Sequence, residues 1–231
     1  MAVLECKALT KNYGHTAALD GVDFIIEPGR IVGLLGPNGS GKTTLIKLAN
    51  GLLTPTSGEI LVCGIAPGKE SHALVSYLPE RTSIPTWMTT NQLLDFYQDF
   101  YADFRRDAAE EMLQHLNIQP KQQIKQMSKG TREKVQLIVT MSRAAKLYLL
   151  DEPIGGVDPA TRDYILSTIT SNYNPEAAVV ISTHLISDVE KVLDDVIFIN
   201  QGRVVLQSSV DEIREEKGMS VDALFREVFK C

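Results

Sequence analysis

A glycine-rich stretch at residues 36–44 constrains this chain more than any other feature of the sequence. It reads Gly-Pro-Asn-Gly-Ser-Gly-Lys-Thr-Thr and fits the pattern G-x-x-x-x-G-K-[ST] of a phosphate-binding loop. The apolar run 31–35 before it is typical of a buried parallel strand, and residues 45–50 after it are predicted to form a helix that ends at Gly51. This context predicts a nucleoside triphosphate site between a strand and a helix.

The chemistry of phosphate binding explains the residue types in this loop. Glycines permit backbone conformations that a β-carbon forbids, so the amide groups can converge on phosphate oxygens at a helix N-terminus. Lys42 is expected to reach the β- and γ-phosphates, and the hydroxyl of Thr43 is expected to bind Mg²⁺. The predicted nucleotide-binding residues are Gly36, Pro37, Asn38, Gly39, Ser40, Gly41, Lys42, Thr43 and Thr44.

Composition narrows the class of protein. The chain has 231 residues, 44% of them hydrophobic, which is enough for a substantial core. Its net charge is -6 and it has no basic cluster of the kind that nucleic-acid binders carry, so no nucleic-acid partner is expected. Cys6, Cys63 and Cys231 are odd in number and far apart, which predicts reduced thiols in a cytosolic protein.

Targeting and membrane-spanning patterns are also missing from the sequence. The first residues lack the basic start and long apolar core of a signal peptide. No apolar run approaches the roughly 18 residues of a transmembrane helix. We therefore expect no direct membrane insertion, so that any membrane-spanning part must come from a partner.

Strand patterns occupy both ends of the chain and helical patterns occupy its middle. We predict an α/β fold in one domain: residues 1–81 and 144–210 form a core with an antiparallel β part, 82–143 form a helical subdomain, and 211–231 form a helical tail. The predicted strands are 3–9, 17–27, 31–35, 58–64, 74–78, 146–151, 177–182, 196–200 and 203–207, with a turn at 11–14. Helices are predicted from Thr90 and over 105–117, 128–143, 159–172 and 186–193.

Two acidic residues follow the apolar strand 147–150. In a parallel sheet, ligands bind at the carboxyl ends of the strands. Asp151 is therefore expected near the Mg²⁺ that Thr43 holds, and Glu152 is expected to polarise a water molecule toward the γ-phosphate. The alternative, a pair of solvated acids before Pro153, is weakened by the phosphate loop in the same chain.

Five motifs in this order resemble the nucleotide-binding subunit of an ABC transporter over nearly the whole chain. A phosphate loop alone is shared by many ATPases, but the order of all five is much more specific. The motifs occupy residues 36–44, 126–132, 147–152, 156–158 and 182–184. Residues 127–131 read Met-Ser-Lys-Gly-Thr where the family usually has Leu-Ser-Gly-Gly-Gln, a variant similar to those of bacterial exporter-type subunits with a separate membrane partner.

The resemblance implies a P-loop NTPase core that works as a homodimer or as a heterodimer with a related subunit. Each ATP then lies between the phosphate loop of one subunit and Ser128 and Gly130 of the other, with Asp158 at the same interface. Ser128 and Asp158 also precede predicted helices, so each can act as a helix cap. The two roles can coexist.

Further roles follow from the resemblance alone. His184 is expected to contact the γ-phosphate or the attacking water, Tyr13 to stack on adenine, and Glu80 to serve as a Mg²⁺ ligand where the family usually has Gln. The ordinary alternatives are a structural histidine, a core or edge tyrosine and a surface acid. The aromatic residues at 96–104 suit either a core or a groove for a short helix of the membrane subunit.

The resemblance therefore implies an ATPase that binds Mg²⁺ and ATP and powers transport through a transmembrane permease subunit. Its catalytic residues would be Glu152, His184 and Lys42. The expected location is the cytoplasm, on the inner face of the cell membrane. Two alternatives stay open: a soluble ABC-type ATPase without a transport role, and a nucleotide-gated regulatory protein, against which the Asp151–Glu152 pair and His184 argue.

Overall fold

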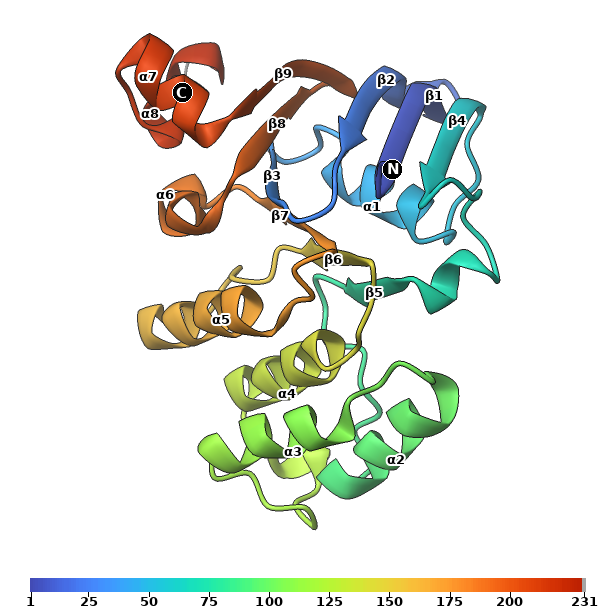
Figure 1. Cartoon of the computed structure of the whole chain (residues 1–231), viewed down its shortest axis with the longest axis vertical. Coiled ribbons are helices and arrows are strands. Elements are labelled where there is room, and N and C mark those ends of the chain that lie inside the picture. The colour runs from blue at the N-terminus through green and yellow to red at the C-terminus, as the bar shows by residue number, and fades with distance from the viewer. Residues whose placement is uncertain (230–231) are drawn as a thin grey trace.

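The computed structural model describes residues 1–229 and contains two β-sheets (Figure 1). The smaller sheet is antiparallel, with the strand order β2-β1-β4. Its strands alternate buried and exposed residues, as expected for a sheet with one covered face. The strands are β1 (Leu4–Tyr13), β2 (Thr16–Ile26) and β4 (Ser57–Val62).

The larger sheet has the order β5-β6-β7-β3-β8-β9, in which only the β8–β9 pair is antiparallel. β3 lies inside this sheet between β7 and β8, and all of its residues are buried. The mostly parallel sheet confirms the predicted α/β fold class. Its strands are β3 (Ile31–Leu35), β5 (Val75–Leu78), β6 (Leu147–Asp151), β7 (Ala178–Thr183), β8 (Asp195–Asn200) and β9 (Arg203–Ser209).

Two hydrophobic cores cover the two faces of the larger sheet. Alternate β3 residues point to opposite sides: Leu35 belongs to one core, and Leu34 belongs to the other. The core that contains Leu34 also holds α1 and the inner face of the smaller sheet, so α1 is packed between the two sheets. The helices around the larger sheet are α1 (Lys42–Ala49), α5 (Pro159–Asn172), α6 (Ile186–Val189), α7 (Val210–Lys217) and α8 (Val221–Phe229).

A third hydrophobic cluster lies among α2 (Thr90–Phe100), α3 (Arg106–His115) and α4 (Lys129–Met141), which gather at one end of the molecule (Figure 1). These helices are inserted between β5 and β6, which are neighbours at the edge of the larger sheet. Aromatic residues of this region lie both in the hydrophobic cluster and on the surface. Phe104 is buried in this cluster, whereas Phe100 and Trp87 are about 70% exposed.

A buried arginine joins this helical segment to the sheet. Arg143 follows α4, is 3% exposed, and forms a bidentate ion pair with Asp103 at 3.0 and 3.1 Å. Its guanidinium also donates to the carbonyls of Ala73, at 2.9 Å, and Val75, and it lies 3.9 Å above the ring of Tyr101. Arg143 therefore ties the connection between α2 and α3 to the start of β5.

The sequence predictions differ from the structure at several element ends. Residues 11–14 were expected to form a turn, but β1 continues to Tyr13 because β2 supplies partners up to the Tyr13–Thr16 pair. The turn is confined to the residues around Gly14, whose φ is 59°. Helix α1 begins at Lys42 rather than after Thr44, and α6 gives way to a 3₁₀ turn at Glu190–Val192.

The remaining predictions concern the cysteines, the tail and the membrane. Cys6 and Cys63 are free thiols, as expected, and Cys231 lies outside the described residues. The tail is helical as far as Phe229, and residues 230–231 also lie outside the described part. Within residues 1–229, no helix combines the length and apolarity that a membrane crossing requires.

Candidate nucleotide site

The phosphate-binding loop connects β3 to α1 and lines a cavity of about 650 Å³. Close packing explains two of its glycines. A β-carbon on Gly36 would lie 2.2 Å from the carbonyl oxygen of Ile199, and one on Gly41 would lie 2.5 Å from that of Ala18. Gly41 and Gly39 also have φ values of 113° and 79°, which disfavour other residues. Gly36 is therefore required by close packing, Gly39 by its backbone conformation, and Gly41 by both.

The β8–β9 turn supports the loop from behind. The N–H of Gly202 donates to the carbonyl of Ser40 at 2.9 Å, and the carbonyl of Gly202 accepts from the N–H of Asp20 at 2.8 Å. The hydroxyl of Ser40 is buried and has no hydrogen-bond partner within residues 1–229. A buried donor without a partner fits a loop whose polar groups are completed by a bound anion.

Lys42 lies at the start of α1 and is 6% exposed. Its ammonium donates to the carbonyls of Gly36 and Pro37, at 2.7 and 3.1 Å, so the side chain folds back along the loop. Burial lowers the pKa of this amine, and the nearby carboxylates of Glu152 and Asp151 act in the opposite direction. The ammonium is thus held at the helix N-terminus, where phosphate oxygens can replace the carbonyls as its partners.

Asp151 ends β6 beside the same loop. Its Oδ1 accepts a hydrogen bond from Ser182 at 2.6 Å and lies 3.3 Å from the hydroxyl oxygen of Thr43. Burial raises the pKa of Asp151, whereas the hydrogen bonds from Ser182 and Thr43 lower it. Glu80, after β5, also lines the cavity. Hydroxyl and carboxylate oxygens are the ligands that Mg²⁺ prefers, so this group of side chains fits the ion.

The metal would need further ligands from its substrate. Within the described part of the chain, no three His, Cys, Asp or Glu side chains are arranged to hold a metal ion. Mg²⁺ is usually bound by one or two carboxylates together with phosphate oxygens. Thr43, Asp151 and Glu80 can therefore supply only part of such a site, and phosphate oxygens and water would supply the rest.

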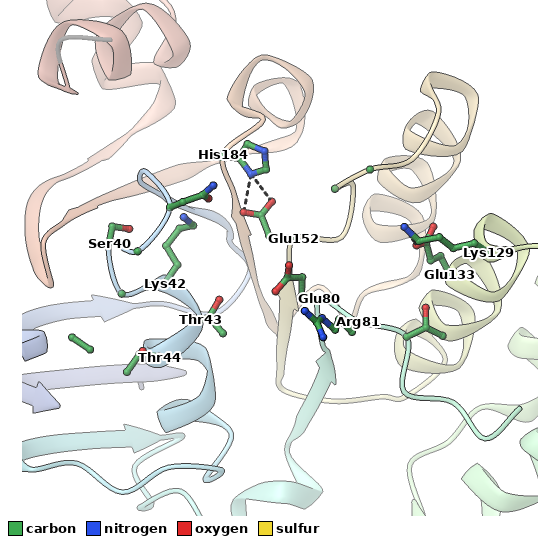
Figure 2. A pocket seen from close by; sticks show the side chains of 17 residues that line it. Ser40, Lys42, Thr43, Thr44, Glu80, Arg81, Lys129, Glu133, Glu152 and His184 are labelled. Atoms are coloured by element: carbon green, nitrogen blue, oxygen red, sulfur yellow. Dashed lines mark hydrogen bonds and ion pairs between the residues drawn. The ribbon is translucent and has the colours of Figure 1, made fainter. Parts of the chain in front are cut away.

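Glu152 and His184 form a pair at the cavity (Figure 2). Nδ1 of His184 lies 3.0 and 3.1 Å from the two carboxylate oxygens of Glu152, and the hydroxyl of Thr183 donates to the same carboxylate at 3.1 Å. The backbone of Glu152 has a φ of 49°, and its N–H donates to the carbonyl of Ser182 at 3.0 Å. A left-handed conformation is uncommon for a residue other than glycine, and the carboxylate of Glu152 lines the cavity.

Comparison with known proteins identifies the family. The ABC transporter family model matches residues 19–155. The ABC transporter ATP-binding protein YxlF of Bacillus subtilis (strain 168) is 31% identical over 227 residues, which cover 96% of this chain and 76% of that protein. The daunorubicin resistance ATP-binding protein DrrA3 of Streptomyces coeruleorubidus is 28% identical over 226 residues, which cover 94% and 72%.

A solved structure described as the ATP-binding subunit of an ABC transporter superposes on this chain with a TM-score of 0.88. The two are 28% identical, and the match covers 98% of this chain and 99% of the other. The chain belongs to the ABC transporter family. It is an ATP-binding and ATP-hydrolysing cassette, and such cassettes dimerise and pair with transmembrane permease subunits.

Some residues predicted for the cassette lie outside the cavity of a single chain. Ser128 caps α4 by accepting a hydrogen bond from the N–H of Thr131 at 3.1 Å, and Asp158 caps α5 through the N–H of Thr161 at 3.1 Å. Tyr13 is half exposed at the end of β1, with the ammonium of Lys11 5.6 Å from its ring centre. The cavity lining found within residues 1–229 includes none of these three, nor Gly130.

Several other residues of the cassette were assigned no role from the sequence, although Ser182 and Thr183 belong to the motif at 182–184. Ser182 and Thr183, next to His184, hydrogen-bond the two acids that end β6. Besides the motif at 182–184, the strand pairing explains these contacts: β7 pairs with β6, and the register places Ser182 opposite Asp151. Residues that line the cavity but were not predicted to bind nucleotide include Ala18, Arg81, Thr82, Lys129, Glu133, Gly155 and Gly156.

Proposed function

We propose that this cassette binds Mg·ATP through residues 36–44 and hydrolyses it with Glu152 as the general base. The observation that carries this proposal is the position of the Glu152–His184 pair at the same cavity as Lys42. A general base must lie within reach of a water molecule beside the terminal phosphate. Residues from β6, β7 and the loop after β3 meet at this point because their strands are neighbours in the parallel sheet.

The chain's own groups account for each part of the reaction. Loop amides and Lys42 hold the β- and γ-phosphates. Glu152 takes a proton from water, whose oxygen bonds to the γ-phosphorus in line with the bond to the β–γ bridging oxygen. That bond breaks, and ADP and inorganic phosphate leave. When bound, Mg²⁺ supplies charge neutralisation at the phosphates, with Thr43, Asp151 and Glu80 as its protein ligands.

The hydrogen-bond geometry supports a more specific part for His184 in this proposal. A neutral imidazole has one N–H, and the contact between Nδ1 and Glu152 uses it. Nε2 is then an acceptor, so only the protonated ring could also donate to phosphate. We therefore give His184 the task of orienting the carboxylate of Glu152, together with Thr183.

A second cassette would complete the site. Ser128, Gly130 and Asp158 lie at helix N-termini outside the cavity of one chain, which suits residues that act across an interface. We propose a head-to-tail pair, of two identical chains or of two related ones, with Tyr13 stacking on adenine. We also propose that the chain forms a single domain in which residues 82–143 are a helical subdomain.

Family membership supports a proposal for the partner and the location. We propose that this cassette works on the cytoplasmic face of the cell membrane, attached to a separate permease subunit. Export is favoured over import by the Met-Ser-Lys-Gly-Thr variant at 127–131 and by similarity to a protein named for daunorubicin resistance. Copurification of a polytopic membrane protein from detergent-solubilised membranes, with ATP and the Glu152→Gln variant, would identify that subunit.

The Glu152→Gln substitution also tests the catalytic assignment. It removes the proton acceptor but keeps the side chain's shape, so ATP hydrolysis should fall by about 100-fold or more. ATP binding should persist, and ATP-bound pairs should accumulate. Glu176→Gln changes a surface carboxylate that pairs with Lys146 and should leave turnover unchanged. Near wild-type hydrolysis by Glu152→Gln with intact ATP binding would refute the assignment.

A further inference from the structure

Arg162 joins the two segments that carry the proposed catalytic pair, and the proposed reaction does not use it. Its Nε donates to the carbonyl of Val157 at 3.2 Å, and a terminal nitrogen of the guanidinium donates to Oδ2 of Asp188 at 2.7 Å. Val157 lies in the segment that leaves β6 after Glu152. Asp188 lies in α6, four residues after His184. Arg162 therefore forms a second connection between segments that already meet at the Glu152–His184 contact.

The position of Arg162 in α5 favours this connection. Arg162 is the fourth residue of the helix, near the positive end of the helix dipole, and the first turn contains no acidic residue. A positive charge there is stabilised by acceptors from outside α5, and the carbonyl of Val157 and the carboxylate of Asp188 provide them. The two charged side chains are only 29% and 33% exposed, so salt and water screen their attraction less than at an open surface.

The segment after β6 reaches the cavity through a short turn. The N–H of Gly155 donates to the carbonyl of Glu152 at 3.1 Å, and both Gly155 and Gly156 line the cavity. The two glycines have no side chains that could hold this segment against α6. The contact with the guanidinium comes directly after them, at Val157. It therefore restrains the far end of the turn, while His184 contacts the carboxylate of Glu152 at the near end.

We propose that Arg162 is a positioning residue for ATP hydrolysis, which holds the segment after β6 against α6 so that Glu152 and His184 keep their contact. The inference rests on the proposed function, in which Glu152 is the general base. Misplacement of a reacting group by 1 Å can lower a rate about 100-fold. The cavity lining found within residues 1–229 does not include Arg162, so its loss should slow the reaction without weakening ATP binding.

Steady-state hydrolysis by purified full-length variants tests this inference. Arg162→Met should lower kcat for ATP by about tenfold and leave KM within about twofold of wild type. Arg162→Lys keeps the charge but lacks the fork that reaches both acceptors, so it should recover only part of kcat. Asp188→Asn leaves the arginine in place and should lower kcat by a smaller factor. The Tm of each variant should lie within about 4 °C of wild type, because a partly exposed ion pair adds little stability.

A neighbouring ion pair provides the matched control. Asp163 follows Arg162 in α5, and Lys191 lies in the 3₁₀ turn directly after α6. Their side chains pair at 3.2 Å and are 74% and 61% exposed. This pair also links α5 to the segment after His184, but it involves no residue of the segment after β6. Lys191→Met should therefore leave kcat and KM at wild-type values.

A double variant separates positioning from general stabilisation. If Arg162 acts through the Glu152–His184 contact, Arg162→Met should cause little further loss of kcat in a His184→Ala background, where that contact is already absent. An equal fold loss in both backgrounds would overturn the inference, as would wild-type kcat or a raised KM alone in Arg162→Met. These results leave the proposed function intact. Near wild-type hydrolysis by Glu152→Gln would instead overturn the proposed function, and the inference with it.

Discussion

Replacement of Arg143 by Met should destabilise this cassette severely, because the arginine is buried and its ion-pair partner Asp103 would lose its counter-charge. Its guanidinium is 3% exposed and pairs with Asp103, which is itself only 24% exposed. Removal of one partner of a buried ion pair costs about 3–5 kcal/mol, because the other charge stays behind without compensation. Partial access of water to Asp103 places the expected loss near the lower limit, about 3 kcal/mol.

For a chain of this length, such a loss lowers the Tm by roughly 6–12 °C. Circular dichroism with thermal and urea unfolding would measure it. A double variant that adds Asp103→Leu should recover part of the loss, because it removes the uncompensated carboxylate. The double variant thus separates the cost of a stranded charge from the loss of packing against Tyr101.

Arg106→Ala is the matched control. Arg106 has two ion pairs at 2.7 Å, with Asp95 and Glu110, but both carboxylates are more than half exposed. Exposed pairs contribute little, so this variant should lose about 1 kcal/mol or less. If Arg143→Met were no more harmful than Arg106→Ala, burial would not be what makes this ion pair important.

Two further predictions concern the nucleotide site. Because burial raises the pKa of Asp151, the folded chain binds a proton more tightly than the unfolded chain, and the free energy of unfolding falls as the pH rises above about 4. The nucleotide-free Asp151→Asn variant should therefore have a higher Tm than wild type at pH 7, with a flatter pH profile, while Mg²⁺-dependent hydrolysis is lost; a lower Tm at pH 7 would contradict this sign. Gly36→Ala should cost about 1–3 kcal/mol and abolish ATP binding, because the new β-carbon collides with the backbone of Ile199. Gly68→Ala, which has open space and needs no unusual φ, should be neutral in both unfolding and binding assays.

Local sequence patterns predicted the elements around the phosphate loop well. The apolar run 31–35 is β3, and the helix that follows is α1. The rule that parallel strands present ligands at their carboxyl ends placed Asp151 near Thr43, and the two side chains lie 3.3 Å apart. These features depend on short stretches of sequence or on strand direction alone, so one sequence is enough to predict them.

Features that depend on pairing between distant segments could not be predicted in this way. Ser182 meets Asp151 only because β6 and β7 are adjacent in a particular register. The contact between Glu152 and His184 needs the same register and also the unusual backbone at Glu152. Similarly, Lys11 and Asn12 have the polar character of a turn, yet partners from β2 keep them in β1. Periodicity within a segment contains no information on such partners.

The phosphate loop owes its shape to strands that come late in the chain. β3 is hydrogen-bonded to β7 and β8, the carbonyl of Ile199 lies against Gly36, and Gly202 anchors Ser40. All of these supports lie beyond the segment 19–155 that carries the family match. A polypeptide limited to that segment would retain most of the diagnostic motifs but would lack the scaffold behind them. Nucleotide binding thus depends on the completed sheet, and the motifs alone are not sufficient to form the binding site.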